Sequence, residues 1–253
     1  MNFSLLCKVF GISLILRMII DNNLQYNFEE SLVRIDQMLN LQIVEEEASA
    51  QVPILSELPT KGGVITNCSV MHIEIKSTSS ESSGANLRVL RAFLSEAVAI
   101  LSSQIHCVDI IVLGTRLTGV FSTPFKNNIE ALIDKAAMIN SLAQVISRKA
   151  KGMGLPSLTV KIGIDYGEAM LMRFGMYSVS EAMPSALAWM GRPVNIASKL
   201  IDTTNDNWNI WISWVVYRNL SDTYTKFFHH EEKSGAYGAD VINMTMKNWL
   251  NKQ

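Results

Sequence analysis

The stretch VKIGIDYGE, residues 160–168, and the stretch WMGRPVNIASKL, residues 189–200, decide the fold of this chain. The first alternates apolar and small residues and predicts two strands joined by a tight turn. The second has a proline where the first turn of a helix tolerates one, and it predicts a short helix from Pro193 to about Asp202. Asn195 and Lys199 are four residues apart, so both lie on one face of this helix and can converge on one ligand.

Length, charge and composition limit the kind of protein that this chain can be. Its 253 residues, 48% of them hydrophobic, suffice for one large domain or for one domain with an N-terminal extension. The formal net charge is -1 and the basic residues are scattered, so we expect no nucleic-acid partner. The three cysteines have neither metal-type spacing nor the pattern of a disulfide framework, which indicates a reducing cytoplasm.

The first 20 residues are the one membrane-like stretch of the sequence. Lys8 and Arg17 interrupt it and leave an apolar run shorter than the ~20 residues that a spanning helix needs. A translation start at Met18, a buried helix, an interfacial anchor and a cleaved signal peptide are the alternatives, although no small-residue cleavage pattern follows. We therefore expect a cytoplasmic protein that does not span a membrane.

The chain divides into an N-terminal part, residues 1–60, and a larger domain, residues 61–253. Apolar residues at steps of three and four predict an amphipathic helix over 27–46, which would form an N-terminal helical extension ending in the acidic run at 45–47. Prolines and a Gly-Gly pair at 53–63 then indicate a linker.

The larger domain has the periodicity of an α+β fold. Strands are predicted at 64–75, 106–113, 117–123, 157–165, 168–173 and 209–213, and further strands around Phe227 and Val241. Helices are predicted at 86–101, 127–148, 193–202 and 215–220, the first of them capped by Asn86 and buried along Leu87, Leu90, Leu94, Ala97 and Leu101. The order βαββαββαβ predicts helices packed on a mostly antiparallel sheet.

Taken together, these motifs resemble class III nucleotidyl cyclases, and most closely the pyrimidine cyclases of the Pycsar anti-phage systems. The resemblance runs from about Asn27 to the C-terminus. Its carriers are Asn67–Ser69 leading into Ile73–Ile75, Gly119–Lys126, Ile162–Glu168 and Trp189–Leu200. The resemblance implies a homodimer with composite sites between facing protomers. It also implies a reaction in which the ribose 3′-hydroxyl of a nucleoside triphosphate attacks the α-phosphate and pyrophosphate leaves.

The resemblance also implies the roles of individual residues. In the family, two acidic residues hold two divalent ions, so Glu74 corresponds to the first metal carboxylate and Ile75 to the residue whose backbone carbonyl is a ligand. Glu74 is a hard oxygen ligand suited to Mn²⁺ or Mg²⁺. Thr115 stands where the second metal aspartate is expected and lacks its charge. Asn195 corresponds to the residue that orients the ribose, and Lys199 stands where many members carry a transition-state arginine, whose planar fork it lacks.

Base selection can be read at two further positions of the resemblance. Ile111 and Ala188 fall where adenylate cyclases carry a lysine and an aspartate for the adenine edge, and neither side chain can form a hydrogen bond. The resemblance therefore implies that side chains at other positions recognise the base. Tyr166 and Arg173 are the candidates for substrate binding, and a core-edge tyrosine and a solvated arginine are the alternative interpretations of the same residues.

Two other acidic residues could be taken for the missing carboxylate. Asp109 is six residues before Thr115 on the same strand, which at ~3.3 Å per residue is too far. Asp165 would be a substitute only if the fold brought it close. The run His229 to Glu232 resembles a metal cluster, but adjacent residues of a strand point to opposite faces, so a solvated edge is the better interpretation.

Two functions remain open from the sequence. The first is a dimeric pyrimidine cyclase that converts UTP, or as second choice CTP, into the 3′,5′-cyclic monophosphate, which would act on a cyclic-nucleotide-responsive effector in anti-phage defence. The second is a catalytically impaired cyclase-homology module that binds a nucleotide or pairs with an active protomer. Thr115 motivates the second, because loss of one of two metal carboxylates slows a two-metal reaction by orders of magnitude.

Overall fold

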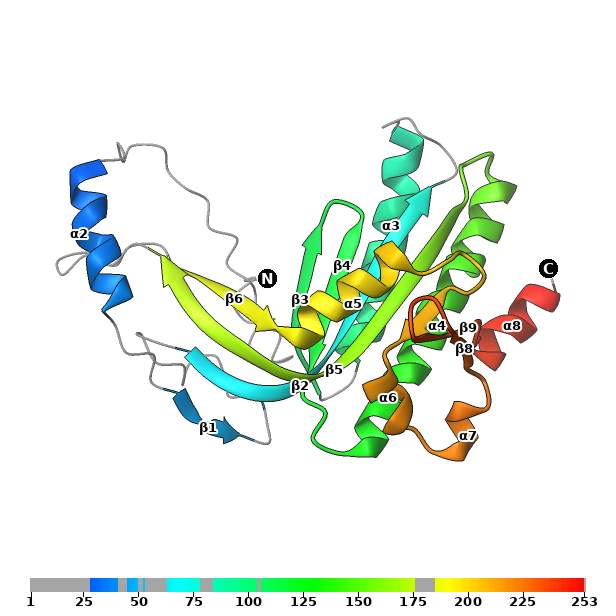
Figure 1. Ribbon diagram of the computed structural model, residues 1–253. Coiled ribbons are helices and arrows are strands. Elements are labelled where there is room, and N and C mark those ends of the chain that lie inside the picture. Colours follow the sequence, from blue (N-terminus) through cyan, green and yellow to red (C-terminus); the bar gives the residue numbers. More distant parts are fainter. Residues whose placement is uncertain are drawn as a thin grey trace.

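The computed structural model describes residues 28–40, 45–49, 52, 63–77, 84–103, 106–175 and 185–252, and a curved nine-stranded sheet runs through them (Figure 1). Its main path has the order β3-β4-β2-β5-β7-β9-β8, while β1 pairs with β2 and β6 pairs with β5. The β1–β2 and β5–β7 pairs are parallel and the others antiparallel. The strands are β1 Glu45–Ser49, β2 Gly63–Ser77, β3 Cys107–Leu113, β4 Arg116–Phe121, β5 Leu158–Gly175, β6 Ser185–Gly191, β7 Ile210–Ile212, β8 His229–Glu231 and β9 Ala236–Ala239.

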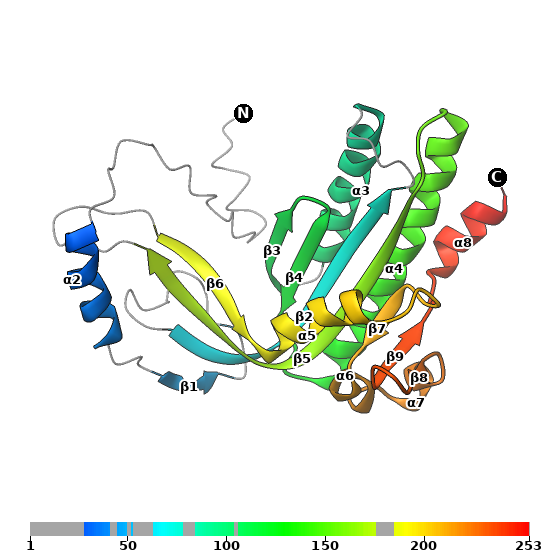
Figure 2. The ribbon, with the colours of Figure 1, turned by 45° about the horizontal axis from the view of Figure 1, so that its top comes forward.

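Helices cover the two faces of this sheet unequally. The long helices α3, Gly84–Ser102, and α4, Lys126–Gly152, pack on one face, and α5, Arg192–Thr203, lies on the opposite face (Figures 1 and 2). The remaining helices are α2 Phe28–Leu39, α6 Trp214–Arg218, α7 Asp222–Thr225 and α8 Met244–Asn251. The predicted α+β class is confirmed. The observed elements from β2 to β7 also follow the order βαββαββαβ, but the strand before α5 is β6, which was not predicted, and not the predicted strand at 168–173.

The two faces of the sheet have separate cores because side chains alternate along a strand. On β2, Met71 and Ile73 are fully buried in the large core under α3 and α4, whereas Cys68 and Val70 are buried in a smaller core on the face of α5. Burying one such aliphatic side chain stabilises the fold by about 1.5–3 kcal/mol. The strand is therefore buried on both faces along most of its length, as expected for a central strand.

β5 differs from the prediction. The turn expected within the 160–168 stretch is absent, and β5 runs unbroken over 18 residues, paired with β2 from Leu158 to Met172. Gly163, one of the two glycines that suggested a turn, serves close packing instead. A Cβ atom on Gly163 would lie 2.1 Å from the backbone carbonyl oxygen of Ala197, so the missing side chain lets α5 rest directly on the strand. The two strands predicted at 157–165 and 168–173 are one strand.

Other parts of the chain also differ from the prediction. The predicted helix over 27–46 ends at Leu39, and the acidic run lies in β1, parallel to β2, so this part of the predicted N-terminal segment joins the sheet. Asn86 lies inside α3 and does not cap it, and Leu87 is 62% exposed. The buried face of α3 instead consists of Val89, Phe93, Ala97, Ile100 and Leu101. Helix α8 was not predicted, and the strands expected around Phe227 and Val241 are displaced by a few residues to β8 and β9.

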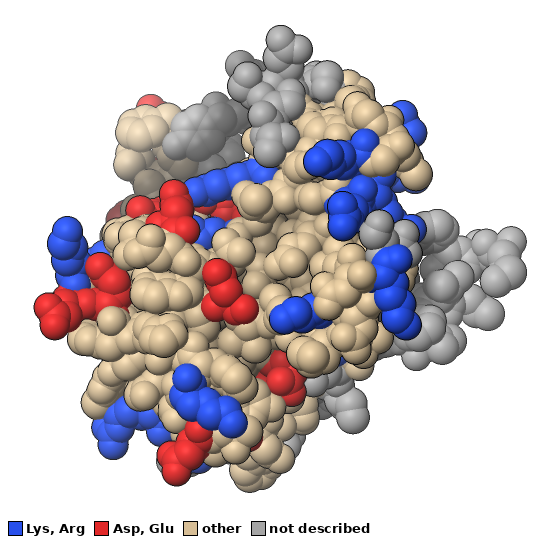
Figure 3. Space-filling model, turned by 90° about the vertical axis from the view of Figure 1, so that its right-hand side faces the viewer, with Lys and Arg blue, Asp and Glu red and all other residues tan. Residues whose placement is uncertain are grey.

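The first half of β2, the last half of β5 and β6 extend as a curved ribbon away from α3 and α4 (Figure 2). The apolar side chains of α2 at Phe28, Leu32, Ile35 and Leu39 are exposed. Among the described residues, no helix combines the length and the hydropathy that crossing a membrane requires. On the side of the molecule in Figure 3, acidic and basic side chains are both present and broad neutral areas separate them.

Candidate functional site

Polar side chains gather on the sheet face that carries α5. The register places Glu74 of β2 opposite Arg116 of β4 and opposite Lys161 of β5, and it places His72 opposite Thr118. Because alternate residues of a strand share a face, the Glu74 and His72 rows lie on the same side of the sheet. This face therefore presents an acid, an imidazole and two basic residues over three neighbouring strands.

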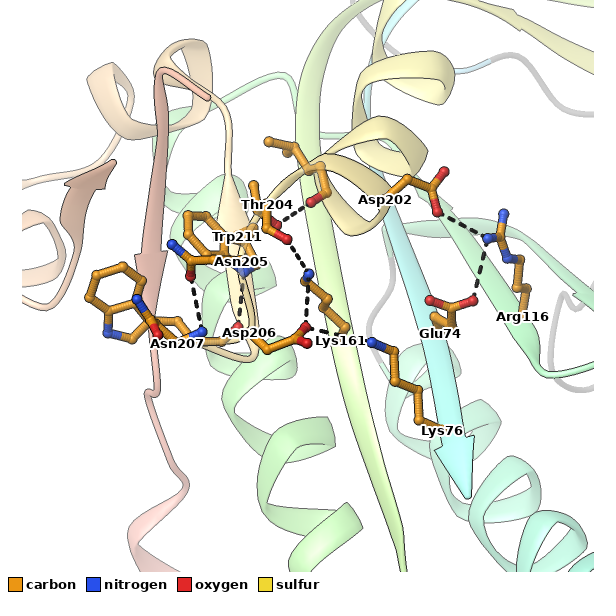
Figure 4. Close-up of polar contacts among 12 residues, drawn as sticks. Glu74, Lys76, Arg116, Lys161, Asp202, Thr204, Asn205, Asp206, Asn207 and Trp211 are labelled. Carbon is orange, nitrogen blue, oxygen red and sulfur yellow. Dashed lines mark hydrogen bonds and ion pairs between the residues drawn. The ribbon is translucent and has the colours of Figure 1, made fainter. Parts of the chain in front are cut away.

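The centre of the group is an ion-pair network between two carboxylates and one guanidinium (Figure 4). The Nη2 atom of Arg116 donates to Oε1 of Glu74 at 3.3 Å and to Oδ1 of Asp202, in the last turn of α5, at 3.1 Å. Thr115 immediately precedes Arg116 in the hairpin turn. Its backbone carbonyl accepts a hydrogen bond from the Ile75 N–H at 2.9 Å. The residues that the resemblance assigns to the metal centre are therefore brought together.

Next to this network, His72 completes the polar row. Its Nδ1 atom lies 2.7 Å from the hydroxyl of Thr118, and its Nε2 atom is buried without a hydrogen-bond partner among the described residues. Burial lowers the pKa of His72, and the positive charge of Arg116 lowers it further. The imidazole is therefore favoured in its neutral form.

The donor set fits one divalent ion at most. Glu74 and Asp202 supply two carboxylates, and Thr115 is exposed and neutral. In the described part of the chain, no group of three or more His, Cys, Asp or Glu side chains could hold a metal ion. Mg²⁺ is often bound by one or two carboxylates together with substrate phosphates, so one ion completed by a nucleotide agrees with these residues. Two ions held by protein carboxylates do not.

Asn195 and Lys199 lie on the exposed side of α5, as the four-residue spacing predicts. Neither side chain makes a hydrogen bond or an ion pair with the rest of the described chain. Lys199 lines an open pocket of about 230 Å³, together with Ile196 and Thr203 of the same helix and Trp214 at the start of α6. One chain thus presents an amide and an ammonium group outward, away from its own sheet.

The start of α5 is anchored by a buried carboxylate. Arg192 donates through Nη1 to Oδ2 of Asp165 at 2.9 Å, to Oδ1 at 3.3 Å and to the carbonyl of Tyr166 at 3.2 Å. The Ser213 hydroxyl also donates to Asp165, whose side chain is 0% exposed. Burial raises the pKa of Asp165, while the Ser213 hydrogen bond and the charge of Arg192 act in the opposite direction. Asp165 therefore holds α5 on the sheet and does not replace the missing carboxylate at Thr115.

A second anchor fixes the far end of α5. The ammonium group of Lys161, only 6% exposed, donates to the carbonyl of Thr204 at 2.7 Å and to Asp206 at 3.2 Å (Figure 4). Lys76 also reaches Asp206, at 3.5 Å. With Arg192 at one end and Lys161 at the other, the helix that presents Asn195 and Lys199 is tied to β5 at both of its termini.

The other residues singled out from the sequence lie elsewhere. Tyr166 packs against the core under α3 and α4, which fits its interpretation as a core-edge tyrosine. Arg173 lies in β5 opposite Leu187, twelve residues beyond Lys161, the β5 residue opposite Glu74. At ~3.3 Å per residue this is about 40 Å along the strand, so Arg173 is not next to Glu74 within one chain.

Of the two positions linked to base selection, Ile111 of β3 is 37% exposed and lies opposite Thr118, on the face of Glu74. Ala188 lies on the distant β6 strand. Asp109 is buried, and its Oδ2 atom accepts a hydrogen bond from the Trp189 indole at 2.9 Å, so it does not serve the site of Glu74 either. Burial raises its pKa.

Two residues of the ion-pair network, Arg116 and Asp202, were missed by the sequence analysis. Arg116 directly follows Thr115, which was the signal that could have found it, because a side chain in that turn must lie near Glu74. Asp202 gave no comparable signal. It is 86 positions beyond Arg116, and only the docking of α5 on the sheet brings it there.

Comparison with known proteins agrees with this geometry. No family model matches the chain. The chain is 30% identical over 227 residues to a uridylate cyclase of Gulbenkiania mobilis, with 84% of each protein covered. It is 22% identical over 239 residues to a uridylate cyclase of Treponema porcinum, which covers 90% of this chain and 82% of that protein.

Among solved structures, the guanylyl cyclase Cya2 shares the fold, with a TM-score of 0.56 and 14% identity over 72% of this chain and 96% of that one. The low identity limits this likeness to the fold. The similarity to the Gulbenkiania protein, by contrast, extends over most of both sequences. The chain therefore belongs to the class III nucleotidyl cyclase family, together with the uridylate cyclases that it resembles.

Proposed function

We propose that this protein is a pyrimidine nucleotide cyclase that converts UTP, or as second choice CTP, into the 3′,5′-cyclic monophosphate and pyrophosphate. The observation that carries the proposal is the pair Asn195 and Lys199, exposed and unpaired within the described chain on a helix anchored at both ends. These side chains point away from their own Glu74 face. A second copy facing the first would complete a site with Glu74 of one protomer and Asn195 and Lys199 of the other.

Each residue has a role in this reaction. Lys199 stabilises the negative charge that develops on the α-phosphate, as a point charge without the fork of an arginine. Asn195 orients the ribose so that its 3′-hydroxyl faces that phosphorus atom. Glu74 and the Ile75 carbonyl would hold one ion, Mn²⁺ or Mg²⁺. When bound, it lowers the pKa of the attacking hydroxyl or neutralises charge on the leaving phosphates.

The pyrimidine preference is supported by the relatives and by Ile111. An exposed isoleucine offers the base an apolar contact and no hydrogen bond, so it cannot recognise a purine edge. The cyclic product would act as a signal in the cytoplasm, on an effector that responds to cyclic nucleotides in anti-phage defence. Tyr166 and Arg173, which do not lie beside Glu74 of the same chain, remain the proposed candidates for base recognition and would reach the site from the facing protomer.

The direct test is to incubate the purified protein with each of the four nucleoside triphosphates and Mn²⁺, and to identify products by mass spectrometry. Cyclic UMP, or cyclic CMP, is expected. The variants Glu74→Gln and Lys199→Ala should each be inactive, whereas Lys247→Ala, which removes an exposed lysine of α8, should match the wild type. A folded, dimeric protein that makes no cyclic product from any of the four substrates would refute the proposal.

A mixing experiment tests whether the site is shared. Equal amounts of Glu74→Gln and Lys199→Ala protein should recover about a quarter of the wild-type rate once subunits exchange. About half of the dimers are then mixed, and each mixed dimer has one intact site of two. A site contained within one chain would recover no activity in the mixture.

The second candidate function, a binding module without turnover, is favoured by one observation, the threonine at position 115. Thr115→Asp discriminates between the two. A large gain in activity would mean that the wild-type site is intact but impaired, and no gain in an inactive protein would favour the binding module.

A further inference from the structure

Arg116 occupies an unusual position in a centre expected to bind cations. The same nitrogen, Nη2, contacts Oε1 of Glu74 at 3.3 Å and Oδ1 of Asp202 at 3.1 Å, so two carboxylates from β2 and α5 converge on one positively charged atom. Convergent carboxylate oxygens are the arrangement that a hard divalent cation prefers. The guanidinium therefore sits where these two residues would otherwise direct a metal ion.

The sequence changes at this turn act in the same direction. Thr115 removes the negative charge that the resemblance places there, and Arg116, the next residue, adds a positive charge. Of the two carboxylates and the guanidinium, one net negative charge remains. Such a centre attracts a divalent ion less strongly than two free carboxylates would, and it lacks the donors for a second ion.

A guanidinium can do part of what a metal ion does at a triphosphate. It remains protonated at every physiological pH, and its planar N–H groups match phosphate oxygens in pairs. Within the described residues only Nη2 of Arg116 makes hydrogen bonds, so Nε and Nη1 remain for a ligand. The side chain is 41% exposed, which leaves these atoms accessible.

We propose that Arg116 supplies, from within the chain, the positive charge that a second divalent ion supplies in a two-ion centre, so that each site takes no more than one exchangeable ion. The inference rests on the proposed function for the identity of the ligand, a nucleoside triphosphate. Asp202 has a positioning role in it, because its carboxylate binds the same guanidinium nitrogen as Glu74 and so fixes the side chain from a second element, α5.

The test measures Mn²⁺ binding to the full-length protein by the electron paramagnetic resonance signal of free Mn²⁺, without nucleotide. Arg116→Gln should bind Mn²⁺ at least about tenfold more tightly than the wild type. Even in water, the energy of repulsion between a unit positive charge and a divalent ion a few ångströms away exceeds the free energy that corresponds to a tenfold change in affinity. Arg116→Lys retains the charge and should remain close to the wild type. Arg88→Gln, which removes an exposed arginine of α3, controls for net charge.

The double variant Arg116→Gln/Glu74→Gln should lose the gain in Mn²⁺ affinity, which would show that the added affinity arises at this centre. With 3′-deoxy-UTP, which cannot cyclise, the wild type should bind one Mn²⁺ per chain. Equal Mn²⁺ affinity of the wild type and Arg116→Gln, an equal gain in Arg88→Gln, or two ions per wild-type chain would overturn the inference. None of these binding measurements needs turnover. A protein without cyclase activity whose Arg116→Gln variant gains Mn²⁺ affinity would refute the proposed function and retain this inference.

Discussion

Substituting Gly163 by alanine should move α5 and disable the site without touching any residue that contacts the substrate. A Cβ atom at this position would lie 2.1 Å from the Ala197 carbonyl oxygen and 3.2 Å from Cβ of Leu200, whereas ordinary contacts begin at 3.4 Å. The helix would have to withdraw from β5 by about 1.3 Å. Forcing a methyl group into a packed interface costs about 1–3 kcal/mol of unfolding free energy.

The effect on activity should exceed the effect on stability. A shift of α5 carries Asn195 and Lys199 with it, and a misplacement of about 1 Å can reduce turnover about a hundredfold. Urea denaturation gives the change in unfolding free energy, and initial rates with UTP give kcat. Gly152→Ala is the matched control, because nothing lies within 4 Å of a Cβ atom at the end of α4.

The control should be within about 1 kcal/mol of the wild type, since alanine is favoured over glycine in a helix, and its kcat should be unchanged. If Gly163→Ala had the same stability and the same kcat as Gly152→Ala, the close contact between α5 and β5 would not exist as described. The role assigned to Gly163 would then be wrong.

Three further predictions concern buried groups. Arg192→Gln should destabilise the fold by about 2 kcal/mol, which is less than the loss of a fully buried ion pair would cost because Arg192 is half exposed. The same variant should lower kcat more than it raises KM. Unchanged stability in urea denaturation would contradict the anchoring role of Arg192. Since burial raises the native pKa of Asp165, its contribution to stability is fully present below the pKa of the unfolded chain and is lost as pH rises through the native pKa. The stability of the wild type relative to Asp165→Asn should therefore fall with rising pH in that window, and a pH-independent difference would exclude this titration. Burial raises the pKa of Cys68 to about 12, so iodoacetamide should label this thiol only after unfolding, as mass spectrometry of native and denatured protein can show.

Much of the fold follows from local patterns. The helix at 193–202 was predicted almost to its observed bounds, because a proline in the first turn and apolar residues at helical spacing are signals contained in one short segment. The strands at 106–113 and 117–123 were predicted close to the observed β3 and β4 for the same reason. The prediction of a turn in the 160–168 stretch was wrong because glycine can either permit a turn or permit the close approach of another backbone. The local sequence does not distinguish between these two roles. Only the approach of Ala197 to Gly163 decides for close packing.

The sequence by itself determined the family resemblance, the α+β class, and the placement of Asn195 and Lys199 on one helix face. Each depends on spacing along the chain or on motifs within single segments. Only the tertiary structure decided which charges meet. Glu74, Arg116 and Asp202 come from β2, β4 and α5, and their contacts depend on strand register and on how closely α5 docks on β5. Those are set by packing between distant segments, which is why a site expected to bind two metal ions contains an arginine instead.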